Sequence, residues 1–306
     1  MEPSLTDLVA AELSEPVDPR GAAMAAAIAA HYPRAARAVL FYGSCLRERQ
    51  LDGLMLDFYL IVSDYRAAYG RSWLATANRL IPPNVFPFEH DGLAAKYAVL
   101  SEADFARECS LRARSVSVWA RFAQPSRLVW AADQAARALC IDAVADAHLT
   151  LFQMTLPLVG REGLHPEALW ERGFSLTYAA ELRAEGRAKP GAIVEADPER
   201  YRRFTGPALA EVAARSAVGP AGEVAFIASP DAMRRRWRRL QRKGKALTLL
   251  RLLKASATFA NGIDYLAWKI NRHAGTKIVL KPWQRRWPLL AGLILLPRLL
   301  RRGAIR

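Results

Sequence analysis

The chain has 306 residues and 52% of them are hydrophobic, so it is long enough to bury a substantial core and is not a disordered protein. Its three cysteines and five histidines show no spacing typical of a transition-metal site, and so few cysteines exclude a disulfide framework and indicate a reducing compartment. The formal net charge of +15 is concentrated in residues 231–306, which hold 20 Lys and Arg against two acids. Such a segment indicates an anionic partner, either acidic phospholipid or nucleic acid.

The first residues carry acids and no apolar stretch typical of a signal peptide, so we expect a cytoplasmic protein of a bacterium-like cell. Residues 5–38 show the alanine-rich periodicity of helices, interrupted at Pro16 and Pro33.

An apolar segment at residues 38–42 predicts a short buried strand that ends at Gly43 and Ser44. Glycine allows a tight turn and a close backbone approach to a ligand. The serine hydroxyl and the N–H groups that follow can donate to phosphate oxygens. The pair therefore indicates a phosphate-holding turn, with an ordinary strand-to-helix turn as the alternative.

Asp57 lies inside the apolar run of residues 55–62, which predicts a second buried strand. An unpaired buried carboxylate is costly, so this position requires a cation. Mg²⁺ is the natural candidate because it takes hard oxygen ligands, commonly one or two carboxylates together with substrate phosphates. The alternative is that Asp57 stands at a strand end in a salt bridge with an arginine.

Lys96 lies in a third predicted strand, residues 93–100, which follows a Pro- and Asn-containing region at 81–92. A lysine in an apolar strand needs a partner, which favours a phosphate-neutralising role, unless its stem carries the ammonium to water. Farther along, the pattern predicts a helix over 102–122, a short strand over 128–130 and mainly helical structure from residue 133, with 217–230 as a linker.

The basic segment contains two amphipathic parts. Residues 233–259 place Trp237 and four leucines at helical spacing among Arg and Lys. Residues 289–296 form an apolar run preceded by Trp283 and Trp287, which is well short of the ~20 residues that a spanning helix needs. Tryptophan, arginine and a short apolar stretch are typical of attachment to the membrane interface. The alternative is a helix packed on its own domain with solvated arginines.

Several segments resemble, in the same order, motifs of the mitochondrial-type phosphatidate cytidylyltransferases, the peripheral CDP-diacylglycerol synthases known for translocator assembly and maintenance. Residues 42–44 resemble that family's YGS turn, residues 55–58 its MLDF segment and residues 95–101 its IKYGVIS strand. Arg121 with Pro125 resembles its GRLxKP segment, and residues 174–194 resemble its LSYxGDxRM stretch with the acid, lysine and NIV that follow. The similarity spans about residues 40–210.

The chain also departs from that family. Cys45 stands where the family has the glycine that follows YGS, and Glu181 stands where it has an aspartate. Ala68 and Tyr69 stand where it has a tryptophan-histidine pair. The carboxylates survive in kind, but the turn is bulkier.

The resemblance implies cytidylyl transfer from CTP to phosphatidate, which yields CDP-diacylglycerol and pyrophosphate. The attacking phosphate is already ionised at neutral pH, so no residue has to remove a proton from it, and the protein's task is positioning and charge neutralisation. The implied cofactor is Mg²⁺, and the implied partners are CTP, phosphatidate and an anionic membrane surface, with no nucleic acid. The implied roles are metal binding by Asp57 with a second carboxylate from Asp52, Asp64 or Glu181, catalysis by Asp57, Lys96 and Arg121, and substrate binding by Tyr42, Gly43, Ser44, Arg183 and Lys189.

We therefore predict an α+β protein in three parts: a nucleotidyltransferase-fold domain with a mixed sheet over residues 1–130, a mainly helical second domain over 131–230 and a basic membrane-associating tail over 231–306. The predicted place of action is the cytoplasmic face of a bacterial inner membrane, as a peripheral protein. Two alternatives stay open: a nucleotidyltransferase that acts on nucleic acid, and a catalytically inactive, lipid-bound interaction protein.

Overall fold

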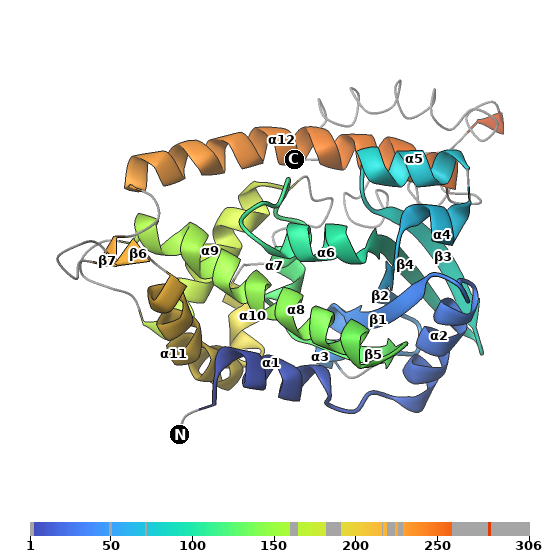
Figure 1. Ribbon diagram of the computed structural model, residues 1–306, viewed down its shortest axis with the longest axis horizontal. Helices are drawn as coiled ribbons and strands as arrows, with labels where there is room; N and C mark the ends of the chain where they lie inside the picture. The colour runs from blue at the N-terminus through green and yellow to red at the C-terminus, as the bar shows by residue number, and fades with distance from the viewer. Residues whose placement is uncertain are drawn as a thin grey trace.

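The structure is a computed structural model that describes residues 3–48, 51–70, 72–159, 165–181, 191–215, 217–218, 224–225, 229–258 and 281–282. Within these ranges it confirms the α+β class, with a five-stranded mixed sheet packed between helices (Figure 1). None of the helices in these ranges is both long enough and apolar enough to cross a membrane.

The strands follow the order β3-β4-β2-β1-β5 across the sheet, in which β2 and β4 run parallel and the other neighbours are antiparallel. Their bounds are Ala36–Tyr42 (β1), Met55–Val62 (β2), Asn84–His90 (β3), Leu93–Ser101 (β4) and Ser126–Ala131 (β5). The register places Tyr42 of β1 opposite Asp57 of β2, and Asp57 opposite Lys96 of β4. One end of the sheet therefore gathers three of the residues that the sequence analysis singled out.

Local signals explain several of the helix starts. Ser4 forms a capping box with Asp7, Asp133 caps α8, and Pro19 stands in the first turn of α2. The helices are α1 (Leu5–Leu13), α2 (Pro19–Ala30), α3 (Ser44–Glu48), α4 (Tyr65–Tyr69), α5 (Trp73–Leu80), α6 (Glu102–Cys109), α7 (Trp119–Phe122), α8 (Gln134–Thr155), α9 (Pro166–Ala179), α10 (Gly191–Glu195), α11 (Pro198–Arg215) and α12 (Pro230–Thr258), with a 3-10 turn η1 (Leu156–Leu158) and a short strand pair β6 (Ala217–Val218) and β7 (Val224–Ala225).

Alternation along β2 divides its side chains between two cores. Phe58 and Leu60 pack on one face with Ile28 of α2. Tyr59 points to the other face and joins the larger core, which includes residues of α6, α7 and α8. Asp57 is two residues from Tyr59, so its carboxylate belongs to the face that these helices cover.

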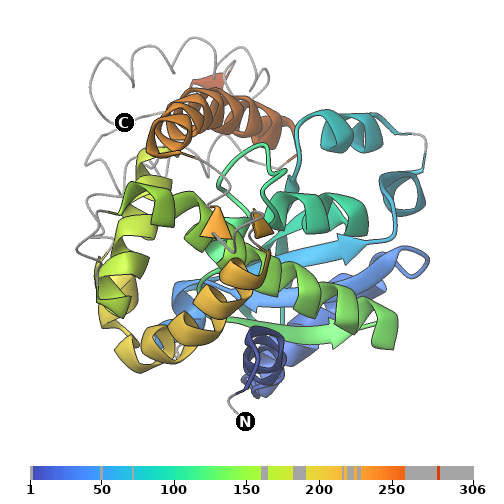
Figure 2. The ribbon, with the colours of Figure 1, turned by 60° about the vertical axis from the view of Figure 1, so that its left-hand side comes forward.

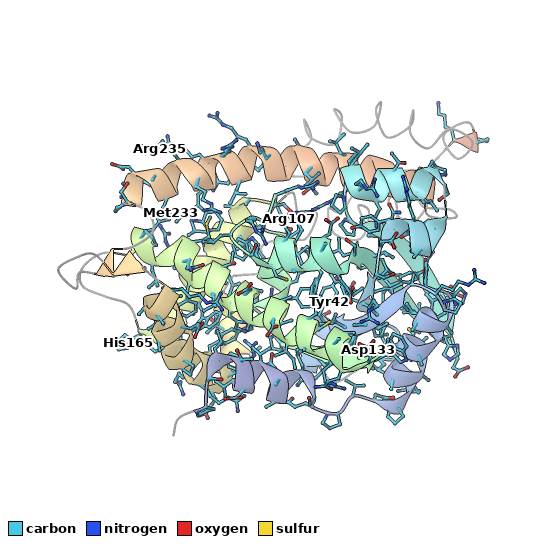
Figure 3. All side chains as sticks on the ribbon, in the orientation of Figure 1. Tyr42, Arg107, Asp133, His165, Met233 and Arg235 are labelled. Atoms are coloured by element: carbon cyan, nitrogen blue, oxygen red, sulfur yellow. The ribbon has the colours of Figure 1, made fainter. Side chains whose placement is uncertain are left out.

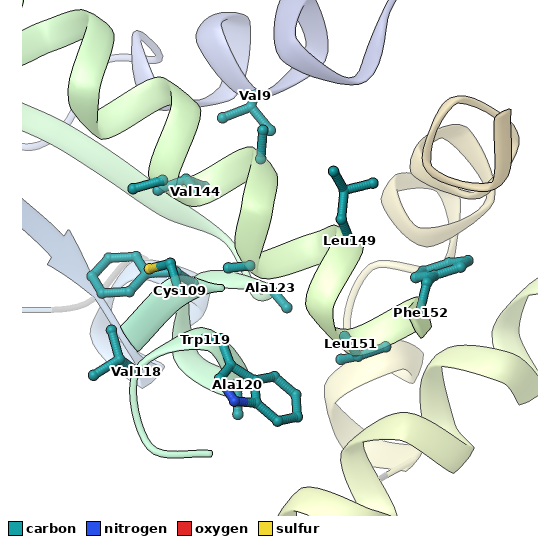
Figure 4. Close-up of a cluster of buried hydrophobic side chains, with 14 of the residues drawn as sticks. Val9, Cys109, Val118, Trp119, Ala120, Ala123, Val144, Leu149, Leu151 and Phe152 are labelled. Carbon is teal, nitrogen blue, oxygen red and sulfur yellow. The ribbon is translucent and has the colours of Figure 1, made fainter. Parts of the chain in front are cut away.

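Helix α8 is buried along most of its length and carries the larger core. Figure 4 shows Val144, Leu149 and Phe152 of α8 among side chains of α1 and α7, including Val9 and Trp119. The same core continues into the first turns of α12. Side chains from all three predicted parts of the chain thus share one core, and the three-part division stays a prediction.

Helix α12 covers most of the segment 233–259, and its side that carries Met233 and Trp237 packs on the protein itself. Trp237 is 2% exposed, and its indole N–H donates to the Met154 carbonyl at 2.8 Å. Figures 1 and 2 place α12 along one edge of the molecule, and Figure 3 shows Met233 on its inward side and Arg235 on its outward side. The side of α12 that carries Trp237 therefore packs on the protein's own core, and membrane association of the basic segment stays a prediction. Residues 283–306, including Trp283 and Trp287, lie outside the described residues.

Two elements of the structure differ from those that the sequence predicts. The region 81–92 contains strand β3, which sequence analysis did not predict because Asn84 and Pro87 are typical of loops; as an edge strand, β3 tolerates a proline. The helix expected over 102–122 is two helices, α6 and α7, separated by residues 110–118. Serine and β-branched residues fill that gap, and both disfavour a helix interior.

Candidate active site

The turn after β1 lies directly against the carboxylate of Asp57. Gly43 has φ +98°, a conformation that residues with a side chain rarely adopt. A Cβ placed on Gly43 would lie 3.2 Å from Asp57 Oδ2 and 3.5 Å from its Cβ. Glycine at this position therefore serves both the backbone turn and the close approach to the acid.

Asp57 is paired with Lys96 from the neighbouring strand. The Lys96 Nζ lies 3.0 Å from Asp57 Oδ1, and both side chains are about a quarter exposed, at 27% and 22%. Asp57 Oδ1 itself is buried and takes part in no hydrogen bond of good geometry within the described residues, so the contact is an ion pair. The partner is a lysine and Asp57 stands inside β2, unlike the strand-end arginine pair considered above.

Three aromatic rings lie next to this ion pair. Tyr42 packs against Tyr59 and Phe122, with ring centroids 5.3 and 5.9 Å away. Burial raises the pKa of the Tyr42 phenol well above its usual value, and the carboxylate of Asp57 adds to this. Tyr42 therefore stays neutral and can donate its phenolic hydrogen.

Arg121 and Glu181 approach Tyr42 from the helical side. The Arg121 guanidinium, on α7, donates to Glu181 Oε1 at 3.2 Å and also to the Ser117 carbonyl. Burial acts to lower the pKa of Arg121, but Glu181 and the phenols of Tyr59 and Tyr42 outweigh it and hold this pKa above its usual value. Arg121 and Glu181 are 60 residues apart in the sequence. Both lie near Tyr42, and they therefore belong to the same group of side chains as Asp57.

The structure does not bring the other carboxylates to Asp57. Asp52 is largely exposed and pairs with Arg20 at 2.8 Å. Asp64 caps α4 by accepting the N–H groups of residues 66 and 67, beyond the far end of β2. The strand from Asp57 to Val62 alone spans about 17 Å. Neither Asp52 nor Asp64 is therefore placed to share a metal ion with Asp57, and Glu181 is engaged by Arg121.

The residues present fit a magnesium ion bound mainly through its substrate. Asp57 Oδ1 is a buried, hard oxygen donor beside the glycine turn. No cluster of three or more His, Cys, Asp or Glu side chains is found within the described ranges. A single carboxylate with phosphate oxygens completing the shell is a common arrangement for Mg²⁺.

Ser44 and Cys45 directly follow the glycine turn, and they differ in exposure. Ser44 is exposed at the first position of α3, directly after the turn. Arg183 and Lys189 lie outside the described residues. Cys45 is buried, and its thiol donates to the Met55 carbonyl at 3.5 Å. The bulkier residue thus packs into the smaller core next to the turn.

Sequence reasoning missed two contributors to this site. Ser117 receives Arg121 at its carbonyl, and Arg251 of α12 donates to its hydroxyl at 2.8 Å. Arg251 has the helical spacing of a residue on the inward side of α12, since it lies 14 residues after Trp237. This spacing predicts that Arg251 faces inward with Trp237, whereas the high net charge of the segment favours an exposed position.

Comparison of the chain with protein-family models and with curated proteins found no match.

Proposed function

We propose that the protein transfers a cytidylyl group from CTP to phosphatidate at a membrane surface, with Mg²⁺ as cofactor and a nucleotidyltransferase fold. The observation that carries this proposal is the contact of the Gly43 turn with Asp57, itself paired with Lys96. A phosphate-holding turn beside a strand carboxylate is the arrangement that metal-assisted nucleotidyl transfer requires. The motif resemblance of residues 40–210 supplies the substrate class.

In this reaction an oxygen of the phosphatidate phosphate attacks the α-phosphorus of CTP, and the bond to the β-phosphate breaks to release pyrophosphate. When bound, Mg²⁺ supplies charge neutralisation at the phosphate oxygens. Gly43 and Ser44 hold the triphosphate, Asp57 provides the anchoring oxygen, and Lys96 and Arg121 offset negative charge as it spreads toward the leaving group. Tyr42 donates to a phosphate oxygen from the side.

The outer side of α12 and the exposed side of α5 support a membrane as the place of action. Six exposed cations of α12 have no acid partner among the described residues, and Trp73 and Leu80 of α5 are 56% and 67% exposed. In Figures 1 and 2, α5 lies at the same edge of the molecule as α12. Cations beside exposed tryptophan and leucine favour an anionic bilayer. The six cations are Arg235, Arg238, Arg239, Arg242, Lys243 and Lys245.

The test is incubation of the purified protein with CTP labelled at its α-phosphate, Mg²⁺ and liposomes that contain phosphatidate. We expect labelled lipid with the wild type, none with Asp57→Asn, and full activity with the control Asp52→Asn, whose carboxylate faces Arg20. Both variants should sediment with the liposomes as the wild type does. A folded wild type that yields no labelled lipid, or an Asp57→Asn variant with unchanged turnover, overturns the proposal.

The same preparation separates the alternatives. A nucleotidyltransferase that acts on nucleic acid would extend or modify RNA with the labelled nucleotide and would bind it with a steep dependence on salt. A catalytically inactive interaction protein would sediment with anionic liposomes and transfer nothing. Cys45 itself does not favour the inactive alternative, because its side chain is buried and contacts the Met55 carbonyl.

A further inference from the structure

Two cations near the C-terminal end of α12 point into the protein and contact only neutral groups there. Arg251 donates from Nε to the Pro82 carbonyl at 2.6 Å, from Nη1 to the Ser117 hydroxyl at 2.8 Å and from Nη2 to the Ser115 hydroxyl at 3.4 Å. Lys254, one turn later and 8% exposed, donates to the Pro83 carbonyl at 2.8 Å and to the Ile81 carbonyl. Neither cation forms an ion pair with an acid among the described residues.

The acids around these two cations are already paired with other residues. Glu181 is engaged by Arg121 at 3.2 Å, and Glu108 by Arg107 at 3.1 Å. Arg121 and Arg251 converge on the same residue, Ser117, one at its carbonyl and the other at its hydroxyl. Two carboxylates therefore lie near the three cations, but Arg107 and Arg121 engage them, and Arg251 and Lys254 have no carboxylate of their own among the described residues.

Such an excess of buried positive charge is costly unless an anion offsets it. Burial lowers the pKa of Arg251, with Arg121 adding to the effect, and burial with Arg251 lowers the pKa of Lys254 to about 7. Arg251 is partly exposed, and its fork of N–H donors matches phosphate oxygens.

We propose that Arg251 and Lys254, together with Arg121, form a phosphate subsite over the helix-covered face of the sheet near Tyr59, contributed by the basic helix α12. The helix then has two roles: its outward cations meet an anionic surface, and its inward cations hold a phosphate group beside Tyr59 and Arg121. Assigning that phosphate to a substrate rests on the proposed function, whereas the anion site itself does not.

The experiment measures binding of two probes by calorimetry on the full chain, without CTP and with EDTA to remove metal ions. The probes are inorganic pyrophosphate and the soluble short-chain lipid dihexanoyl phosphatidate below its micellar concentration. We expect Arg251→Gln to weaken binding of at least one probe about tenfold or more, as loss of a charged hydrogen-bond donor predicts. The matched control is Arg234→Gln, which removes one exposed charge from the same helix, outside the six outward cations, and should bind both probes like the wild type.

The two probes distinguish the sources of the phosphate. A loss confined to pyrophosphate assigns the subsite to the nucleotide, and a loss confined to the short-chain lipid assigns it to the acceptor headgroup. Where Arg251→Gln is too unstable to measure, Arg251→Lys keeps the charge and loses the fork, and its binding should fall severalfold while that of Arg234→Lys is unaffected. Equal binding by the Arg251 variants and the wild type, or no binding of either probe by the folded wild type, overturns the subsite. Because no transfer is measured, this result is independent of the test of the proposed function.

Discussion

Asp57 and Lys96 are register partners on the parallel strands β2 and β4, with the lysine Nζ 3.0 Å from the carboxylate Oδ1. The ion pair offsets the charge of a strand acid at a partly buried position, and Asp57 Oδ1 takes part in no hydrogen bond among the described residues. A metal ion that binds Asp57 has to compete with this ammonium. On the proposed function, Lys96 would turn to the substrate phosphates and leave the carboxylate of Asp57 to hold the metal ion.

We therefore expect Lys96→Gln to increase the stabilisation of the protein by Mg²⁺ and to lower the rate of cytidylyl transfer. Added Mg²⁺ should raise the melting temperature of the variant more than that of the wild type, because the ion no longer competes for Asp57. Cytidylyl transfer should fall about 100-fold or more, since a donor to the developing charge is lost. Arg34→Gln, at an exposed position after α2, is the control for both measurements. An identical Mg²⁺ response in Lys96→Gln and the wild type would show that the pair does not control access to Asp57.

The glycine turn can be tested with a matched pair of glycines. Gly43 and Gly53 both have positive φ, at +98° and +74°, so an alanine at either position is strained by about 1–2 kcal/mol. Only at Gly43 does the new Cβ meet Asp57, because no atom lies within 4 Å of it at Gly53. We expect Gly43→Ala and Gly53→Ala to lower the free energy of unfolding, measured by urea titration, by similar amounts. Only Gly43→Ala should lose nucleotide transfer. Equal activity of the two variants would mean that the turn does not position the carboxylate.

How far the sequence could predict this site depends on the range of the contacts. Gly43, Asp57 and Lys96 were predictable because each lies on a short apolar segment whose pattern marks a strand, and adjacent strands bring them together. The contacts of Arg251 with Pro82 and Ser117 depend on how α12 docks over more than 130 intervening residues. Periodicity shows that one side of that helix is apolar, but it does not show what covers it.

Contacts that depend on the folded arrangement also explain why the structure differs from the predictions for Asp64 and for the region of β3. Asp64 was a reasonable carboxylate by its short distance in sequence, yet an extended strand carries seven residues to the opposite end of the sheet. Strand β3 carries loop-forming Asn84 and Pro87, and only its edge position makes them compatible with pairing to β4.

Two tryptophans, one on α12 and one on α5, separate a structural role from a surface role at the edge of the molecule where these helices lie. Trp237 is buried against Trp119 and the Met154 carbonyl, so Trp237→Ala should lower the free energy of unfolding by about 3–5 kcal/mol. Trp73→Ala, on exposed α5, should leave it within about 0.5 kcal/mol of the wild type. We expect Trp73→Ala instead to reduce cosedimentation with liposomes that contain anionic lipid. Unchanged sedimentation of this variant would exclude α5 from the membrane contact.

The buried cluster of Glu12, Arg200 and His148 should make stability depend on pH. It joins α1, α11 and α8: Arg200 donates to Glu12 Oε1 at 2.8 Å, and its Nη2 lies 3.2 Å from His148 Nε2. Burial and the charge of Arg200 lower the pKa of His148 from 6.5 to about 4. The folded protein therefore binds fewer protons on this histidine than the unfolded chain between these values, so its contribution is complete above pH 6.5 and is lost as the pH falls toward 4.

Urea titrations of the wild type at pH 7, 6 and 5 should show a loss of about 2 kcal/mol over this range, because the unfolded state gains the proton first. Glu12 does not contribute within the range: burial opposes its ionisation, but Arg200 holds its pKa below 4.5. In His148→Phe the free energy of unfolding should be lower at pH 7, since Arg200 loses a neighbour, and should vary much less between pH 7 and 5. His165→Gln, which replaces an exposed histidine, should keep the slope of the wild type. An unchanged slope in His148→Phe would place the pH dependence elsewhere in the protein.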